Sequence, residues 1–296
     1  MAVYRIKKNM SIGIVGGGFV GRATGLFKSK NIKIKVYDKE ESRRYPKNVK
    51  LEDLSKCHLV FVCLPTPMGE DEKCHTKIVE KCIKDLVKSG CKKEDIIIRS
   101  TVPIGFCEKH NVCNMPEFLT ERNWPLDFKT CPVRLFGVPK FKEYGQSIVN
   151  HPTIYKVRNL FKIAKELDLV DSDKIEFTTC DLSEASKLTR NAFLATKISF
   201  FNEIYDLCDV YDLNYKALQK MVTYDERIGE SHTSVPGYGN KRGFGGTCLP
   251  KDLKSLLSSF EDKNIDSYIL KNVDKRNDEI DRPDKDWAED KGRSSI

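Results

Sequence analysis

The chain has 296 residues, of which 51 are Lys or Arg and 43 are Asp or Glu, so its formal net charge is +8. This length predicts about two domains, and 32% charged with 40% hydrophobic residues excludes a disordered or fibrous protein. No apolar run approaches the roughly 20 residues of a membrane-spanning helix, and no apolar segment of a signal peptide follows the basic N-terminus. We therefore expect a soluble, cytoplasmic protein without a membrane partner.

The first element is an apolar strand, Ser11–Gly17, which runs into the glycine motif Gly16-Gly-Gly18-Phe-Val-Gly21. A helical stretch continues to Phe27, and a second strand, Ile32–Asp38, ends on an acidic residue. This order is the Rossmann dinucleotide-binding fingerprint. The residues expected to contact the cofactor are Gly16, Gly18, Phe19, Val20, Gly21 and Asp38.

Each position of the fingerprint has a physical role. Gly16 permits the tight turn, Gly18 lets the backbone approach a pyrophosphate, and Gly21 allows the helix to pack closely on the strand. Asp38 would accept hydrogen bonds from the ribose hydroxyls and repel a 2′-phosphate, which favours NAD. Arg43 and Arg44 follow closely, so NADP stays open, as does a purely structural glycine turn.

Strand-like and helical segments then alternate, which predicts an α/β fold with a parallel, doubly wound sheet. The helices are expected at Thr76–Ser89 and Thr153–Leu167, and the strands at His58–Pro65, Ile96–Thr101, Val112–Asn114, Arg134–Val138 and Ile175–Cys180. Ligands of such sheets bind beyond the carboxyl ends of the strands. Pro65, Thr66 and Thr101 lie at those ends, and we predict that they contact the cofactor.

After Cys180 the pattern becomes helical. Asp181-Leu-Ser-Glu184 predicts a capping box, and the helix continues without Gly or Pro to Val210. Its length predicts a link between domains or an oligomer interface. A basic, glycine-rich loop over Gly229–Gly246 leads to another helix that ends near Ser259, and the charged residues from Lys271 to Ile296 are expected to be solvated.

We accordingly expect a dinucleotide-binding domain over 1–180, a helical domain for dimerisation and catalysis over 181–275, and a charged tail over 276–296. The positive charge is interleaved with acidic residues, which predicts a small anionic ligand and no nucleic acid. The eleven cysteines form no Cys-x-x-Cys pair and the five histidines do not cluster with them, so no metal site is expected.

Six motifs occur in the order found in the UDP-glucose/GDP-mannose dehydrogenase family, which the chain resembles over nearly its whole length. They are the glycine motif at 16–21, Pro65-Thr-Pro67, Ser100-Thr-Val-Pro103, Asn114-Met-Pro-Glu-Phe-Leu-Thr-Glu121, Glu184-Ala-Ser-Lys187-Leu-Thr-Arg-Asn191 and Gly243-Phe-Gly-Gly-Thr-Cys248-Leu-Pro-Lys-Asp252. The fourth contains an inserted Met115, and the last is the most specific.

The resemblance implies a double oxidation of a nucleotide-sugar alcohol to a uronic acid, with NAD as cofactor. Cys248 would hold the intermediate aldehyde as a thiohemiacetal and then as a thioester that water cleaves. Lys187 and Asn191, four residues apart on one helix, would stabilise the oxyanions. Asp252 would handle the hydrolytic water.

By the same resemblance Glu117 takes part in the acid–base steps, and Thr101 holds the water or the sugar hydroxyl. Glu121 and Gly245 would contact the sugar, together with Lys187 and Asn191. Arg227 would reach the substrate across a homodimer or higher homo-oligomer. The alternative without a catalytic role is that Lys187 forms an ordinary surface ion pair with Glu184.

Of the family substrates we expect UDP-glucose, with UDP-N-acetyl-hexosamine and GDP-mannose open. A β-hydroxyacid-type dehydrogenase that oxidises once, and a nucleotide-binding protein without catalysis, are the alternatives. Family members usually carry a further nucleotide-binding domain. Lys291-Gly-Arg293 resembles the segment that leads into that domain.

Overall fold

The computed structural model describes residues 9–140, 151–289 and 292–295. It divides the chain into two compact units, the first formed by Met1–Pro65 with Thr76–Lys187 and the second by Thr66–His75 with Leu188–Ile296. The division therefore falls after Lys187 instead of after Cys180. A short segment from the middle of the first unit belongs to the second.

In the described part of the first unit, seven strands form one sheet in the order β2-β1-β3-β4-β5-β6-β7. They are β1 (Met10–Val15), β2 (Ile32–Tyr37), β3 (Leu59–Val62), β4 (Ile96–Ile98), β5 (Cys113–Asn114), β6 (Arg134–Val138) and β7 (Ile175–Thr179). The prediction of a doubly wound α/β sheet is confirmed. β5 and β6 pair antiparallel at Asn114 and Gly137, and β7 is parallel to β6, so β6 and β7 run opposite to the other strands. There the all-parallel prediction is wrong, because the connection that contains α4 reverses the chain and does not form a crossover.

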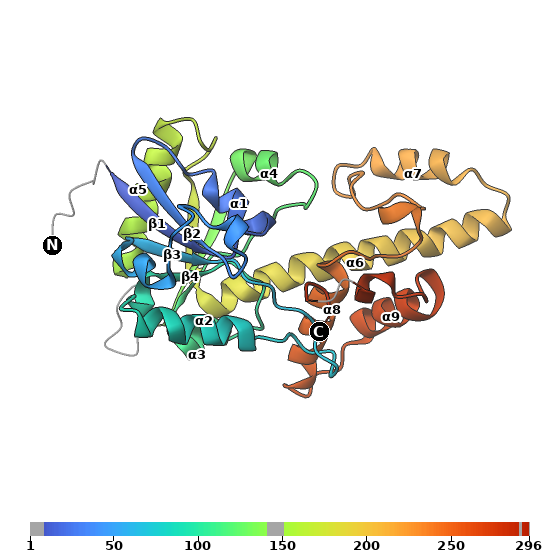
Figure 1. Ribbon diagram of the computed structural model, residues 1–296. Coiled ribbons are helices and arrows are strands. Elements are labelled where there is room, and N and C mark those ends of the chain that lie inside the picture. The colour runs from blue at the N-terminus through green and yellow to red at the C-terminus, as the bar shows by residue number, and fades with distance from the viewer. Residues whose placement is uncertain (1–8, 141–150, 290–291, 296) are drawn as a thin grey trace. The chain divides into compact units, whose positions relative to one another are not determined.

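Helices cover both faces of this sheet (Figure 1). They are α1 (Phe19–Gly25), α2 (Lys77–Lys88), α3 (Phe106–His110), α4 (Trp124–Thr130), α5 (Pro152–Glu166) and the long α6 (Cys180–Val210). One buried cluster joins α1, α4 and α5 to the sheet through Ala23, Phe128 and Phe161. A second joins α2 and α3 to the opposite face, where Ile83 and Phe106 are buried.

The second unit is helical. It contains the part of α6 that follows Lys187, with α7 (Tyr215–Thr223), α8 (Leu249–Glu261) and α9 (Tyr268–Arg276). Leu188 and Ala195 of α6 pack against Leu253 of α8 and Val273 of α9. The helix ends at Val210, as the sequence predicts.

The capping box predicted at Asp181 and Glu184 is wrong. Helix α6 already begins at Cys180, and Glu184 is buried with its carboxylate turned to another element. Its Oε2 accepts a hydrogen bond of 2.6 Å from Gly105 N, and its Oε1 accepts one of 2.8 Å from Cys107 N. Glu184 therefore caps α3 instead of its own helix.

This buried carboxyl group makes stability depend on pH. Burial raises the pKa of Glu184 from 4.5 to about 7, against the opposing hydrogen bonds from Cys107 and Gly105. Because the folded state holds this proton at higher pH than the unfolded chain does, the stabilisation is complete below the ordinary pKa and is lost as pH rises through about 7. The amount at stake is about 3 kcal/mol.

We therefore expect the melting temperature of the wild type to fall relative to that of Glu184→Gln between about pH 5 and pH 8. Glutamine has the same shape but no charge, so its melting curves lack this titration. Melting temperatures measured over that range for both proteins test the prediction, and parallel curves would contradict it.

The segment after Lys271 is not mostly solvated, so that prediction is wrong. Asn277, Asp281, Arg282 and Trp287 are buried within the second unit. The charges there are paired, as in Arg276 with Asp281 at 2.9 Å. A count of charged residues does not distinguish a solvated tail from a segment whose charges neutralise one another on folding.

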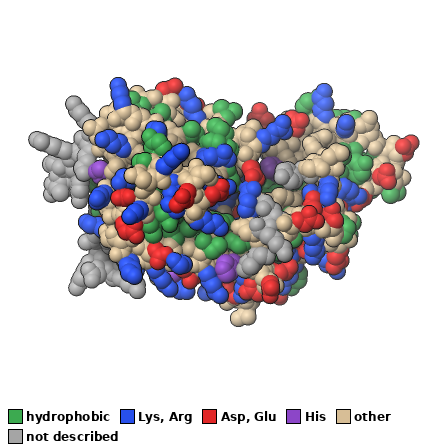
Figure 2. All heavy atoms as spheres, in the orientation of Figure 1, with side chains coloured by type: hydrophobic (Ala, Val, Ile, Leu, Met, Phe, Trp, Pro, Cys, Tyr) green, Lys and Arg blue, Asp and Glu red, His purple; other side chains and the backbone are tan. Residues whose placement is uncertain are grey.

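Three large apolar side chains, Phe193, Phe200 and Leu207, are exposed on α6 at intervals of seven residues. Elsewhere, basic and acidic side chains are interspersed on the face of the molecule seen in Figure 2. No helix of the described residues combines the length and the apolar character required to cross a membrane.

Candidate active site

The glycine motif forms a tight turn between β1 and α1. Gly16 has φ of +97°, and a Cβ atom there would lie 2.4 Å from the carbonyl oxygen of Cys63. A Cβ atom on Gly21 would lie only 1.8 Å from Gly16 O, whereas one on Gly18 would meet no atom within 4 Å. The backbone at Gly18 is thus open to a ligand, and the other two glycines are required by close packing.

Asp38 follows β2 and is held beside this turn. Its Oδ2 accepts a hydrogen bond of 2.6 Å from Gly17 N, and its Oδ1 accepts one of 2.8 Å from Glu40 N. Phe19 and Val20 form the first turn of α1. An open glycine turn with an oriented carboxylate beside it is the donor and acceptor set that a dinucleotide requires, so these residues fit the predicted cofactor.

Arg43 and Arg44, the two arginines that left NADP as a possible cofactor, both bind other groups of the protein. Arg43 pairs with Glu40 at 2.9 Å. Arg44 donates from Nε to Asp38 O at 2.8 Å, and its guanidinium lies 5.0 Å from the centre of the Tyr37 ring.

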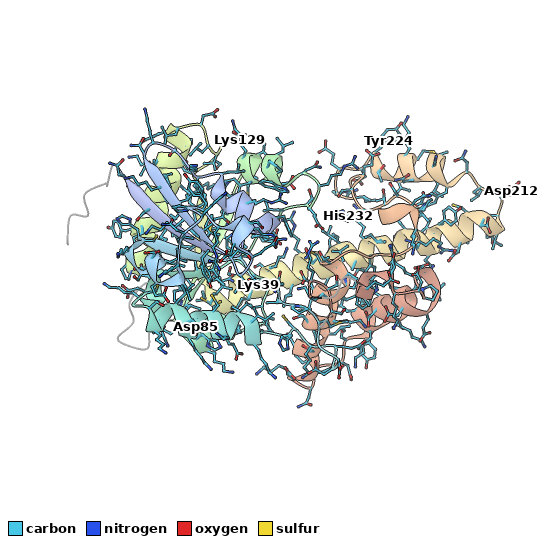
Figure 3. All side chains as sticks on the ribbon, viewed as in Figure 1. Lys39, Asp85, Lys129, Asp212, Tyr224 and His232 are labelled. Atoms are coloured by element: carbon cyan, nitrogen blue, oxygen red, sulfur yellow. The ribbon has the colours of Figure 1, made fainter. Side chains whose placement is uncertain are left out.

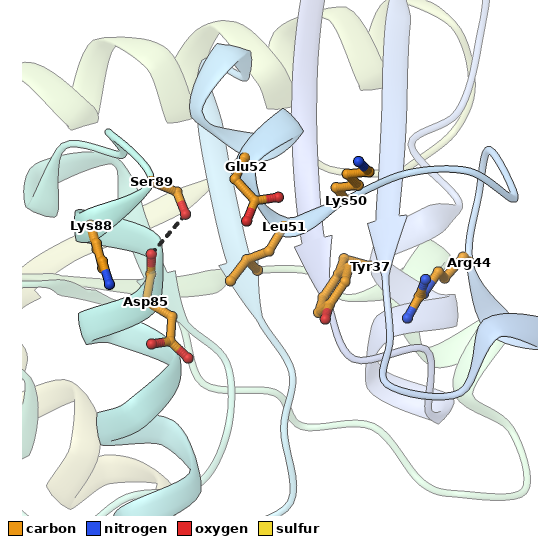
Figure 4. A pocket seen from close by; sticks show the side chains of 8 residues that line it. All are labelled: Tyr37, Arg44, Lys50, Leu51, Glu52, Asp85, Lys88 and Ser89. Carbon is orange, nitrogen blue, oxygen red and sulfur yellow. Dashed lines mark hydrogen bonds between the residues drawn. The ribbon is translucent and has the colours of Figure 1, made fainter.

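Tyr37 and Arg44 also line a pocket of about 540 Å³ that the sequence did not predict (Figure 4). Its other walls come from residues 50–52 and from the C-terminal end of α2, where Ser89 donates a hydrogen bond to Asp85 O. Both signs of charge line it, and none of the predicted catalytic residues does.

The strand-end motifs lie after β3 and β4. Pro65 is exposed and ends the first segment of the first unit, Thr66 is buried in the second unit, and Thr101 is half-buried directly after Ser100. Ser100 has a role that its motif does not predict. Its Oγ donates to Leu64 O at 2.6 Å and accepts from Leu64 N at 3.0 Å, so it ties the ends of the two strands together.

Glu117 and Lys187 form a buried ion pair in the first unit. The Lys187 Nζ atom lies 3.0 Å from Glu117 Oε1, and each side chain is 6% exposed. The other oxygen, Oε2, accepts a hydrogen bond of 2.7 Å from Leu119 N. The surface pair of Lys187 with Glu184 is therefore excluded, and the structure brings together two of the predicted catalytic side chains.

Asn191 and Asp252 meet in the second unit. Asn191 Nδ2 donates to Asp252 Oδ2 at 2.6 Å, and Lys251 Nζ donates to Asp252 Oδ1 at 2.6 Å. Both carboxylate oxygens are thus held in one orientation. Burial disfavours the charge on Lys251, but Asp252 and the neighbouring Cys74 and Cys248 groups outweigh it and raise the pKa of Lys251.

Cys248 is the residue that precedes α8, and it is half-buried. Its carbonyl oxygen accepts the first-turn hydrogen bond from Asp252 N at 2.9 Å. Its Sγ lies 3.7 Å from Thr247 Oγ1. The predicted nucleophile therefore lies one turn before Asp252 at the start of a helix, close enough to Lys251 to influence its titration. Lys251 lies in the Gly243–Asp252 motif, but no role was predicted for it.

The remaining predicted residues are placed differently. Arg227 is 89% exposed and pairs with Asp225 at 2.5 Å. It follows the exposed Tyr224, labelled in Figure 3. Lys197 of α6 donates to the carbonyls of Ile228 and Gly229 at 2.7 and 2.9 Å, which fixes this loop in the second unit. The described residues do not bring Arg227 to Cys248.

The other two predicted sugar contacts, Glu121 and Gly245, differ in exposure. Glu121 is exposed after the loop that carries Glu117, whereas Gly245 is buried in the second unit. A Cβ atom on Gly245 would lie 2.6 Å from Cζ of Arg282.

Comparisons with known proteins match both parts of the chain. The family model described as "UDP-glucose/GDP-mannose dehydrogenase family, NAD binding domain" matches residues 35–151, and the one described as the central domain of that family matches residues 181–279. The UDP-glucose 6-dehydrogenase of Campylobacter jejuni is 31% identical over 91% of this chain and 72% of that protein. That of Rickettsia typhi is 29% identical over 90% and 67%.

The chain spans a different fraction of the length of each relative. It spans about half (49%) of the UDP-glucose 6-dehydrogenase of Pseudomonas aeruginosa. Among solved structures, a UDP-glucose dehydrogenase from Pyrobaculum islandicum has a TM-score of 0.71 at 20% identity, with 93% of this chain and 70% of that chain covered. A 3-hydroxyisobutyrate dehydrogenase from Mycobacterium tuberculosis has a TM-score of 0.63 at 14% identity, with 90% and 92% covered. At these identities, both structural similarities are evidence for the fold alone.

Proposed function

This chain belongs to the UDP-glucose/GDP-mannose dehydrogenase family, with NAD as its cofactor, and from that membership we propose that it oxidises UDP-glucose to UDP-glucuronate. The observation that carries the proposal is the group formed by Asn191, Lys251 and Asp252 beside Cys248. A thiol at a helix start with a fixed carboxylate one turn away suits covalent capture of an aldehyde followed by hydrolysis.

In this proposal the reaction consumes one alcohol, two NAD and one water, and yields one carboxylate, two NADH and three protons. The open glycine turn at Gly18 and the Asp38 carboxylate would hold NAD, which would supply the hydride acceptor for each oxidation. The Cys248 sulfur adds to the aldehyde carbon, and the resulting thiohemiacetal loses the second hydride to become a thioester. Water then attacks the thioester carbon, and the thiolate leaves.

The other proposed roles follow from charge and hydrogen-bonding capacity. Lys187 and Asn191 donate to the oxyanion of each tetrahedral species. Glu117 moves the proton of the alcohol and of the water, and Asp252 orients that water from a carboxylate fixed at both oxygens. Thr101 holds the water or the sugar hydroxyl, and Glu121, Arg227 and Gly245 contact the substrate.

The NADH yield distinguishes this proposal from a single oxidation. With limiting UDP-glucose and excess NAD, we expect two NADH per sugar consumed, measured by absorbance, and UDP-glucuronate as the product identified by mass spectrometry. One NADH per substrate would indicate a β-hydroxyacid-type dehydrogenase. Parallel titrations with UDP, UDP-glucose, UDP-N-acetyl-hexosamine and GDP-mannose identify the sugar, and no NADH with any of them would contradict the proposed function.

We extend the proposal to a homodimer or higher homo-oligomer in the cytoplasm. The exposed Phe193, Phe200 and Leu207 support it, because apolar side chains at a seven-residue spacing on one helix suit the seam between two helices.

A further inference from the structure

The loop that leads to Cys248 is held by side chains from the segment that follows α9. This loop, Arg242–Thr247, contains Gly243, Gly245 and Gly246, so half of its six residues have no side chain with which to fix the backbone. Asn277 is completely buried beneath it. All of these residues belong to the second unit.

Asn277 binds both backbone polar groups of one residue of the loop, Phe244. Its Oδ1 accepts a hydrogen bond of 2.8 Å from Phe244 N, and its Nδ2 donates one of 3.1 Å to Phe244 O. This pattern is that of a strand neighbour, supplied by one amide side chain. Phe244 is thereby fixed four residues before Cys248, and its ring is buried in the core that α6, α8 and α9 share.

The glycines of the loop are required by these neighbours. A Cβ atom on Gly243 would lie 2.4 Å from Asn277 Oδ1, and one on Gly245 would lie 2.6 Å from Cζ of Arg282. Arg282 is itself fixed, because its Nε and Nη2 atoms donate to the two oxygens of Asp286 at 2.6 and 2.8 Å. The loop backbone therefore lies directly on Asn277 and Arg282.

We propose that Asn277 is a positioning residue that fixes the Arg242–Thr247 loop and, through it, the Cys248 thiol at the start of α8. Its effect on turnover rests on the proposed function, whereas its effect on the reactivity of Cys248 does not. A buried amide whose two polar ends bind the N–H and the C=O of one residue constrains the two peptide groups that flank that residue, in position and in rotation, which an apolar contact does not do.

Two measurements test this role. The first is the kcat and KM of Asn277→Ala, for which we expect kcat to fall by about 10-fold to 100-fold while KM for NAD is unchanged. The second is the rate at which iodoacetamide alkylates Cys248, which requires no turnover. Trypsin releases Gly243–Lys251, a peptide in which Cys248 is the one cysteine, so its rate is followed by mass spectrometry. We expect a slower rate in Asn277→Ala.

The matched control is Asn214→Ala. Asn214 lies in the same unit and its Oδ1 accepts a 3.0 Å hydrogen bond from Ala217 N at the start of α7. Its loss costs stability as the loss of a helix cap does. We expect this variant to melt at a lower temperature while the alkylation rate of Cys248 stays at the wild-type value.

A double-variant cycle adds a test that a general loss of stability does not reproduce. Gly243→Ala introduces a methyl group against Asn277 Oδ1, and Asn277→Ala removes that atom. The effect of Gly243→Ala on Cys248 alkylation should therefore be smaller in the Asn277→Ala background than in the wild type.

Each result decides between a positioning role and a structural one. Wild-type alkylation in Asn277→Ala, with or without a loss of kcat, overturns the proposal, as do additive effects in the cycle. If the wild type oxidises no nucleotide sugar but alkylation slows in Asn277→Ala, the proposed function fails and the positioning role stands.

Discussion

Cys248→Ser is expected to abolish formation of the acid while NAD binding stays intact. A serine hydroxyl is a far weaker nucleophile than a thiolate, so the aldehyde is not captured and the thioester does not form. We expect the yield of UDP-glucuronate to fall by roughly a thousandfold or more. The measurements are product analysis by mass spectrometry and titration with NADH.

A second thiol gives the control for this change. Cys131 is half-buried in the first unit and donates to Val133 O, a bond that a serine can also make. Cys131→Ser should therefore keep the wild-type yield. Unchanged turnover in Cys248→Ser would show that the sulfur is not the nucleophile.

Lys187→Met is expected to lower both stability and turnover. The change leaves Glu117 buried without its cationic partner, and removal of one member of such a pair costs about 3 to 5 kcal/mol. It also removes the cation proposed to stabilise the oxyanions. The free energy of unfolding from denaturant titration and kcat with UDP-glucose measure the two losses separately.

The double variant Lys187→Met with Glu117→Gln separates structure from chemistry. Without either charge the buried site no longer holds an unpaired ion, so much of the lost stability should return. Turnover should not return, because neither the cation nor the carboxylate is present. Recovery of kcat together with stability would show that the pair is structural only.

The strand–glycine–helix order and the long helix could be predicted because they rest on local patterns. The apolar strands β1 and β2 and the glycines between them follow one another closely along the chain, so a short window of sequence contains the whole pattern. The same holds for Lys187 and Asn191, whose common helix follows from the absence of Gly and Pro.

The partners of these residues could not be predicted in this way. Glu184 fits a capping box by sequence, but its carboxylate binds the N–H groups of Gly105 and Cys107, almost 80 residues earlier. Asn277 lies in a charged stretch, and only the fold shows that its amide meets Phe244. Sequence motifs identified residue types suited to the chemistry, whereas the groups that hold them come from distant segments.

The excursion of Thr66–His75 into the second unit restricts how the chain can be shortened. Met68 N donates to Ser294 O at 2.8 Å, Glu72 pairs with Lys254 at 3.1 Å, and Lys73 pairs with Asp262 at 3.1 Å. A fragment that stops at Lys187 would lose every one of these partners. During synthesis this segment must likewise wait for more than half of the polypeptide to emerge from the ribosome before it can complete its native contacts.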